Sequence, residues 1–246
     1  MANWKSKRRC RRGYPVAVLV GFEEKGAVLW QIFSKVVKPY AAAKLNGKDN
    51  KSLYNFHECV VDALRPLLKE GVSSIVLTAP MKTNYAGGFL GHIRKHHPWL
   101  FQENGSNAAT FGELVGSAGQ LHEVSDLVKT EGFRKVLCEI TSGDANRIMD
   151  TLEKRLNEID GGTAVLYSLE EIEELVNSQW ECGNLKPEYI VLTDRYLADT
   201  REKNRVHRLL QISKNKRIKT RIVNAEAKAG IRLGQLGGLV CFTEPE

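Results

Sequence analysis

Short apolar runs alternate with amphipathic segments along this chain, and this alternation constrains its fold more than any other feature. Apolar side chains recur at helical spacing over residues 53–68, which predicts an amphipathic helix. Residues 73–78 (SSIVLT) follow as a nearly continuous apolar strand. Such strands are typical of a sheet that helices cover, so the pattern predicts the α/β class.

The chain begins with strands rather than with a helix. Residues 15–20 and 27–33 predict a β-hairpin. Residues 34–44 can add a third strand at an edge or an end of the sheet, because Pro39 lacks the N–H that a central strand needs. A polar loop at residues 45–52 then leads into the first helix.

The next periodic segments are helical. Their spacing predicts helices at residues 84–97, 133–140 and 146–159. Ser142 or Asp144 is the natural N-cap of the last of these helices. The doublet of Gly161 and Gly162 interrupts the pattern and is the best candidate for a domain boundary.

A second alternation follows this doublet. Ser168 and Glu171 form a capping box at the start of a helix. Helices are predicted at residues 167–176, 201–213 and 225–231. Strands are predicted at residues 189–193, 217–223 and 239–242. We therefore expect two α/β domains: a mixed sheet with helices over residues 15–160, preceded by a basic arm at 1–14, and a smaller αβα sandwich over 163–246.

The composition is that of a folded chain. The 246 residues are 42% hydrophobic and include only 7 Pro, which excludes a disordered or collagen-like chain. No apolar run reaches the roughly 18 residues that a membrane-spanning helix needs, and no signal peptide follows the basic N-terminus. The five Cys form no close pair, so we expect reduced thiols and a cytoplasmic protein.

Positive charge gathers in two regions. The first 14 residues carry six basic side chains and no acid, and residues 195–232 carry 12 Lys or Arg against three acids. Both regions indicate a polyanionic partner. A solvated face together with a solubilising tail is the alternative.

The sequence lacks the motifs of the common enzyme and cofactor classes. It contains no P-loop, dinucleotide fingerprint, HExxH or GxSxG, and we expect no cofactor. His92 and His96 fall on one helix face, but a metal site needs a third ligand, and Arg94 and Lys95 would oppose a cation. We therefore expect no metal here; this basic helix end is better suited to contact phosphate.

Three segments of the C-terminal part carry a family resemblance. They are residues 166–171 (LYSLEE), 189–194 (YIVLTD) and 233–239 (LGQLGGL). They resemble the third domain of Pelota and of the class-one release factors of archaea and eukaryotes. The hairpin, polar loop, helix and strand that precede them resemble the middle domain of the same superfamily. The chain looks most similar to compact members related to the Vms-type peptidyl-tRNA hydrolases.

The resemblance implies a ribosome-binding factor that acts in ribosome rescue, recycling or dormancy. In this family the middle domain extends along the A site, and the third domain docks near the stalk base, where it can meet a recycling ATPase. The partners implied are therefore rRNA, tRNA and this ATPase, with no membrane. The family's decoding domain has no counterpart here, so we do not expect stop-codon reading. The side chains expected to contact RNA are Lys7, Arg8, Arg9, Arg11, Arg12, Lys44, Lys48, Lys51, Arg94, Lys95, Lys214, Lys216, Arg217 and Lys219.

One loop decides whether the resemblance extends to catalysis. Release factors and Vms-type enzymes carry a glycine-flanked Gln there, which orders the water that attacks the peptidyl-tRNA ester. Residues 44–51 match this loop but contain no Gln; Asn46, Gly47 and Asn50 are the candidates for a catalytic role. Gln120, in another glycine-rich segment, is expected at a helix start. A peptidyl-tRNA hydrolase is thus the alternative function, and a general structured-RNA-binding protein is the second alternative.

Overall fold

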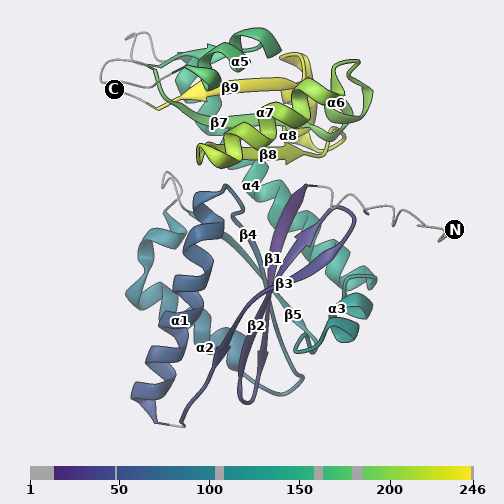
Figure 1. Ribbon diagram of the computed structural model, residues 1–246. Coiled ribbons are helices and arrows are strands. Elements are labelled where there is room, and N and C mark those ends of the chain that lie inside the picture. Colours follow the sequence, from purple (N-terminus) through teal and green to yellow (C-terminus); the bar gives the residue numbers. More distant parts are fainter. Residues whose placement is uncertain (1–13, 48, 103–107, 158–162, 179–184, 245–246) are drawn as a thin grey trace, which may run out of the picture.

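The computed structural model describes residues 14–47, 49–102, 108–157, 163–178 and 185–244. These residues form two α/β units that are joined by one long helix (Figure 1). None of the helices in the described ranges combines the length and the apolar composition that crossing a bilayer requires.

The sheet of the first unit has five strands in the order β3-β2-β1-β4-β5. The strands are β1 (Pro15–Glu23), β2 (Gly26–Phe33), β3 (Val37–Lys44), β4 (Ser74–Ala79) and β5 (Thr110–Val115). Antiparallel pairing joins β1 to β2 and β2 to β3, whereas β4 and β5 pair in parallel. The predicted hairpin and the third strand at the sheet edge are confirmed, and Pro39 lies next to an irregularity in the pairing of β2 with β3.

Helices cover both faces of this sheet. They are α1 (Asn50–Lys69), α2 (Tyr85–His96), the short 3-10 helix η1 (Pro98–Phe101), α3 (Leu121–Leu127) and α4 (Glu131–Asn157). Because side chains alternate between the two faces of a strand, Val18 and Ile75 pack under α1 and α2, whereas Leu19 and Val76 pack under α3 and α4. The predicted helix at 53–68 and the strand at 73–78 are therefore confirmed as the centre of this core.

The second unit is built on a four-stranded sheet in the order β6-β9-β7-β8. Its strands are β6 (Val165–Leu166), β7 (Pro187–Thr193), β8 (Lys219–Val223) and β9 (Leu239–Thr243). Its helices are α5 (Leu169–Asn177), α6 (Asp194–Asp199), α7 (Lys203–Asn215) and α8 (Lys228–Gln235). Buried residues of α5 and α7 pack on one face, and α8 packs on the other together with the second half of α4. This is the predicted αβα sandwich.

Helix α4 corrects the prediction of two helices at 133–140 and 146–159, because it runs unbroken from Glu131 to Asn157. Ser142 and Asp144, the predicted caps, lie inside it. A single glycine in a helix costs only about 1 kcal/mol, and the helix is packed on both sides of Gly143. Phe133 packs on the first sheet and Leu152 on the second. The hydrophobic core therefore changes within α4, while the expected boundary at Gly161 and Gly162 lies outside the described residues.

Candidate functional site

The β3–α1 loop is tied to the fold at both of its ends. The Leu45 N–H donates to the Lys25 carbonyl in the turn between β1 and β2, at 2.9 Å. At the other end, the Asp49 carboxylate accepts hydrogen bonds from the Ser52 N–H (3.0 Å) and from the Ser52 hydroxyl (2.6 Å). These hydrogen bonds lower the pKa of Asp49, because they favour its ionised form. Asp49 is thus the N-cap of α1.

The three residues predicted for catalysis take different positions around this cap. Asn46 is exposed in the loop, whereas Asn50 is the first residue of α1 and is also exposed. A Cβ added at Gly47 would lie 2.8 Å from Asp49 Oδ1 and 2.8 Å from Ser52 Oγ. A side chain at residue 47 would therefore crowd the two side chains that form the helix cap.

The loop lies at the end of the first unit that is farthest from the second unit, where α1 begins (Figure 1). Strands β1, β4 and β5 run parallel, so their carboxyl ends meet at one edge of the sheet. The contact of Leu45 with the turn after β1 brings the loop to that same edge. Ligands of open α/β sheets bind outside the carboxyl ends of the strands. This edge is therefore the candidate functional end of the first unit.

Gln120 is placed as the sequence predicts, at the start of a helix. Its backbone N–H donates to the Glu123 carboxylate at 2.9 Å, which caps α3. The preceding glycine-rich segment packs against the sheet, because the Trp30 Nε1–H donates to the Ala118 carbonyl at 2.7 Å.

The predicted cations of the first unit form two separate groups. Lys44 and Lys51 are exposed on either side of the β3–α1 loop. Arg94 and Lys95 are exposed in the last turn of α2, where positive charge is favoured by the helix dipole. The Arg94 guanidinium lies 5.9 Å from the centre of the Phe101 ring.

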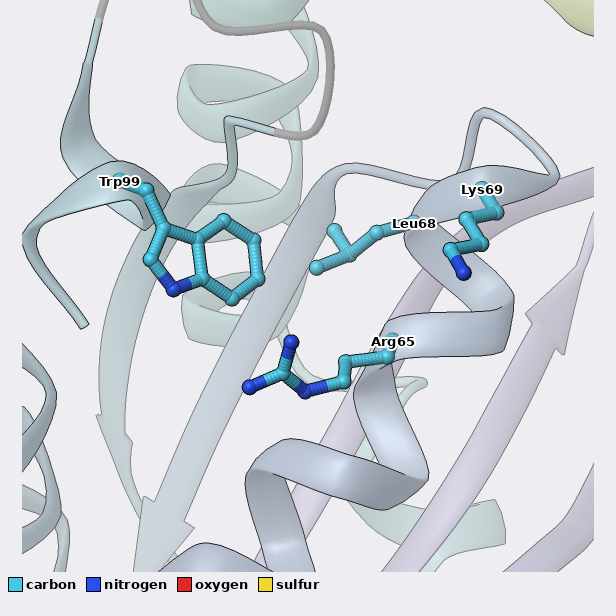
Figure 2. Close-up of a pocket in the computed structure, with 4 residues that line it drawn as sticks. All are labelled: Arg65, Leu68, Lys69 and Trp99. Carbon is cyan, nitrogen blue, oxygen red and sulfur yellow. The ribbon is translucent and has the colours of Figure 1, made fainter.

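A second Arg–aromatic pair also involves a residue of η1, and it was not singled out from the sequence. Arg65 places its guanidinium carbon 5.2 Å from the centre of the Trp99 ring. These two side chains, together with Leu68 and Lys69, line a hollow of about 360 Å³ (Figure 2). Arg65 and Lys69 are exposed and lie one helical turn apart on α1. This spacing is the only sequence signal that they carry. A cation beside an aromatic ring is the pairing that binds phosphate and stacks bases.

The predicted cations of the second unit are largely engaged within the protein. The Lys216 Nζ donates to the carbonyls of Val176 (2.7 Å) and Ser178 (3.1 Å). Lys219 is buried, with its ammonium 4.7 Å from the centre of the Tyr189 ring. Burial also lowers the pKa of Lys219. Its ammonium group also lies 3.7 Å from Glu188 Oε1, so it is held inside the protein and is not presented on the surface.

Lys214 and Arg217 are exposed, as is Lys216 despite the two hydrogen bonds of its ammonium group. The Lys214 Nζ lies 3.1 Å from Glu70 Oε2 at the end of α1, so this pair bridges the two units. Arg217 has a positive φ of 61° in the turn before β8. The remaining side chains of the RNA-contact prediction lie outside the described residues: Lys7, Arg8, Arg9, Arg11, Arg12 and Lys48.

A buried ion pair joins the two units at the middle of α4. The Arg221 Nε of β8 donates to Asp144 Oδ2 at 2.6 Å, and the Arg221 Nη2 donates to Ser73 Oγ at 2.6 Å. The side chains of Asp144 and Arg221 are only 6% and 7% exposed. Local sequence predicts Asp144 as a helix cap, because its true partner lies 77 residues further along the chain.

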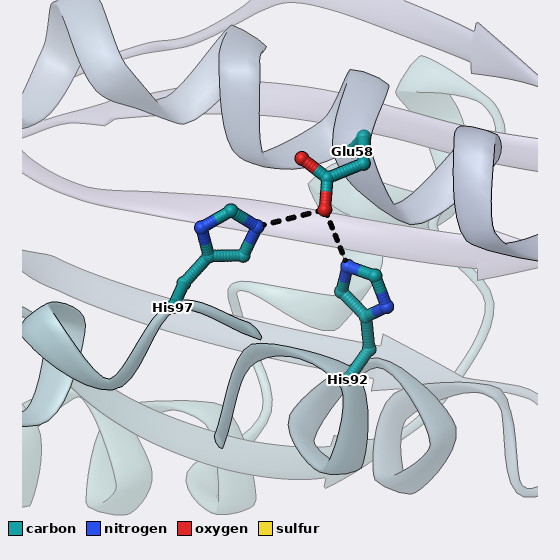
Figure 3. Close-up of side chains that lie close together, drawn as sticks. All are labelled: Glu58, His92 and His97. Carbon is teal, nitrogen blue, oxygen red and sulfur yellow. Dashed lines mark hydrogen bonds and ion pairs between the residues drawn. The ribbon is translucent and has the colours of Figure 1, made fainter. Parts of the chain in front are cut away.

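The histidine segment at the end of α2 acquires a third polar partner from α1. His92 and His97 both direct Nε2 at Glu58 Oε1, at 3.0 Å and 2.9 Å (Figure 3). His96 packs its ring beside that of His92, with centroids 4.8 Å apart, but is exposed. Glu58, which the local sequence does not bring near these histidines, is therefore close to them in space, and it comes from another helix.

No protein-family model matches the chain. Among curated proteins, the chain is 24% identical over 196 residues to a protein pelota homolog of Pyrococcus furiosus, covering 79% of this chain and 49% of the relative. It is 25% identical over 188 residues to the Pyrococcus abyssi pelota homolog, covering 76% of this chain and 47% of the relative. The chain thus spans about half the length of the curated relatives it matches.

The fold is also found among solved structures. A structure described as a model of ribosome-bound archaeal Pelota and ABCE1 superposes with a TM-score of 0.52 over 96% of this chain and 62% of that chain, at 17% identity. The two α/β units and their shared helix therefore have the fold of the matched part of Pelota. The sequence matches are long enough to include parts of both units, so the chain is similar to Pelota in sequence as well as in fold, in line with the resemblance found in the sequence. The closer relation to Vms-type hydrolases stays a prediction.

Proposed function

We propose that this chain binds the ribosome as a Pelota-type factor and acts in ribosome rescue, recycling or dormancy. The observation that carries the proposal is the match of both α/β units to Pelota, in sequence over more than three quarters of the chain and in fold over 96% of it. The solved relative is a ribosome-bound protein described together with ABCE1. We extend both partners to this chain: the ribosome, and a recycling ATPase. A factor with these partners would act in the cytoplasm.

The arrangement of the two units suits them to contact different parts of the ribosome. The β3–α1 loop, with Lys44 and Lys51 beside it, lies at the end farthest from the second unit and is suited to enter the A site (Figure 1). The basic and aromatic face formed by α1, the end of α2 and η1 is suited to rRNA phosphates and bases. The second unit, with Lys214 and Arg217 exposed, would then dock at the stalk base.

The loop geometry favours a binding role over peptidyl-tRNA hydrolysis. Gly47 lies against the side chains that cap α1, and Asn50 is part of the helix itself. An amide that orders an attacking water must be placed within about 1 Å of its productive position. Asn46 is the remaining exposed amide of the loop before the cap, and it is one methylene shorter than Gln. Hydrolysis by Asn46 and Asn50 stays the alternative.

The test combines ribosome binding and nascent-chain release in one experiment. Purified stalled ribosomal complexes are incubated with the full chain, separated on a gradient, and scored for bound protein and released peptide. We expect binding that weakens as salt rises, without release. Protein that stays free of ribosomes at low salt contradicts the proposal.

A loop variant separates the two alternatives. Residues 44–51 are replaced by a Gly-Ser segment of equal length, and Lys129→Gln on the opposite face serves as the control that leaves the loop unchanged. Release by the wild type that the loop replacement abolishes would establish the hydrolase instead. Equally tight binding to isolated structured RNA and to ribosomes would establish the general RNA-binding protein.

A further inference from the structure

Glu58, His92 and His97 converge on one point between α1 and the end of α2 (Figure 3). Each residue offers one atom that could ligate a metal, and these three atoms all lie within 4.8 Å of one another. The Nε2–Oε1 separations of 3.0 Å and 2.9 Å are close to the spacing of two ligands that share a zinc ion, since ligands about 2.1 Å from a tetrahedral ion lie about 3.4 Å apart. The three atoms are therefore close enough together to be candidate ligands of a single cation.

The cluster is sheltered but open on one side. The side chains of His92 and His97 are 7% and 10% exposed, whereas that of Glu58 is 27% exposed. Neighbouring rings fix the orientation of the imidazoles: Tyr54 packs edge-on against His92 at 5.0 Å, and Trp99 packs edge-on against His97 at 6.2 Å. A site whose ligands are already oriented loses little entropy on binding.

The donor set selects the type of metal. Two imidazole nitrogens and one carboxylate oxygen suit zinc and neighbouring first-row ions, whereas magnesium and calcium require mainly oxygen ligands. Two of the nearby cations are held against aromatic rings, because the Arg94 guanidinium lies over Phe101 and that of Arg65 lies over Trp99.

We propose that Glu58, His92 and His97 form a binding site for a divalent first-row transition metal, with zinc as the reference ion. The ion replaces the two hydrogen bonds to Glu58 Oε1, and each neutral imidazole then carries its single proton on Nδ1. Water occupies the remaining position on the exposed side. The bound ion cross-links α1 to the α2–η1 corner and so fixes Trp99 of the hollow in Figure 2. This role is independent of ribosome binding.

The test uses the full chain without a histidine tag, stripped of metal by a chelator and titrated with Zn²⁺ in a calorimeter. We expect one ion per chain with micromolar or tighter affinity. Glu58→Gln and His97→Gln should each weaken binding by at least about tenfold. His122→Gln and His207→Gln, which change exposed histidines elsewhere, should leave it unchanged. Binding that is absent at 100 μM zinc, or equal losses in all four variants, would overturn the proposal.

A spectroscopic measurement on the wild type covers the case of a poorly folded variant. Co²⁺ in a site of nitrogen and oxygen ligands gives visible ligand-field bands without a sulfur-to-metal charge-transfer band. Cys59 is exposed next to Glu58 and is the competing ligand. Ligand-field bands that persist in Cys59→Ser support the site. A charge-transfer band that Cys59→Ser removes, or no bands at all, rejects it.

Discussion

Arg221 of the second sheet donates from Nε to the Asp144 carboxylate at 2.6 Å, in the middle of a helix that begins on the first sheet. The pair is almost fully buried, and Ser73 just before β4 completes it. One guanidinium therefore links the second sheet, the shared helix and the first sheet.

Breaking this pair should destabilise both units together. We expect Arg221→Met to lower the free energy of unfolding by about 3–5 kcal/mol, because it leaves the Asp144 carboxylate buried without its partner. Denaturant unfolding measures the loss. The matched control is Arg205→Met, which breaks the exposed pair with Glu173 and should cost at most about 1 kcal/mol. The double variant Asp144→Leu/Arg221→Met should be less destabilised than the sum of its single variants; additive losses would contradict a direct coupling.

The cap of α1 should give a measurable pH dependence. The folded-state pKa of Asp49 is lowered, so its stabilising contribution is present above the unfolded value of 3.8 and is lost as pH falls through the lower folded value. Asp49→Ala should therefore lower the melting temperature at pH 7, and the difference from wild type should shrink below pH 4. Asp49→Ser, which retains a cap acceptor, should lose less at pH 7. A difference that stays constant down to pH 3 would exclude a contribution from the ionised cap.

The glycine doublet before β9 should respond very differently from a neighbouring glycine in α8. Gly238 has a φ of 82°, and a Cβ there would lie 3.3 Å from Thr193 Oγ1 and from Tyr196 Cβ. Gly238→Ala should therefore cost about 1–3 kcal/mol. Gly234 is helical and has open space around its Cβ position, so Gly234→Ala should stabilise by about 0.5–1 kcal/mol. Chemical denaturation decides, and similar effects of the two substitutions would refute the argument.

The hollow beside Trp99 should contribute to the salt dependence of ribosome binding. Arg65→Gln/Lys69→Gln removes two exposed cations. A plot of log affinity against log salt concentration has a negative slope, and the variant should make this slope less steep by about 2. Lys129→Gln/Lys135→Gln is the matched control on the opposite face. Arg65 and Lys129 are each paired with an aspartate three residues earlier, at 3.1 Å and 3.2 Å. An equal loss in both variants would indicate an effect of net charge alone.

Most of the fold could be predicted because its strands and helices carry their own periodicity. Strand β5 is an exception: its sequence TFGELV places Gly112 and Glu113 in the middle of the strand, and its partly buried pattern resembles that of a loop. The break predicted near Ser142 is absent for a different reason. The partner that makes Asp144 a buried helical residue is Arg221, which lies on another sheet and cannot be inferred from local sequence.

Some features of the candidate site could be predicted from the sequence, and others could not. The loop at 44–51 could be located because it separates a strand from a strongly periodic helix. The burial of Lys219 could not be predicted, because its charge alone suggested a surface position. Glu58 could not be joined to His92 and His97, because only the packing of α1 against α2 brings them within hydrogen-bonding distance.

Helix α4 connects the two units as one continuous helix. Its 27 residues extend over about 40 Å, and each half is embedded in a different core. The span between the β3–α1 loop and the second unit is therefore set by rigid secondary structure and not by a linker. The distance between this loop and the second unit therefore depends on how straight α4 is.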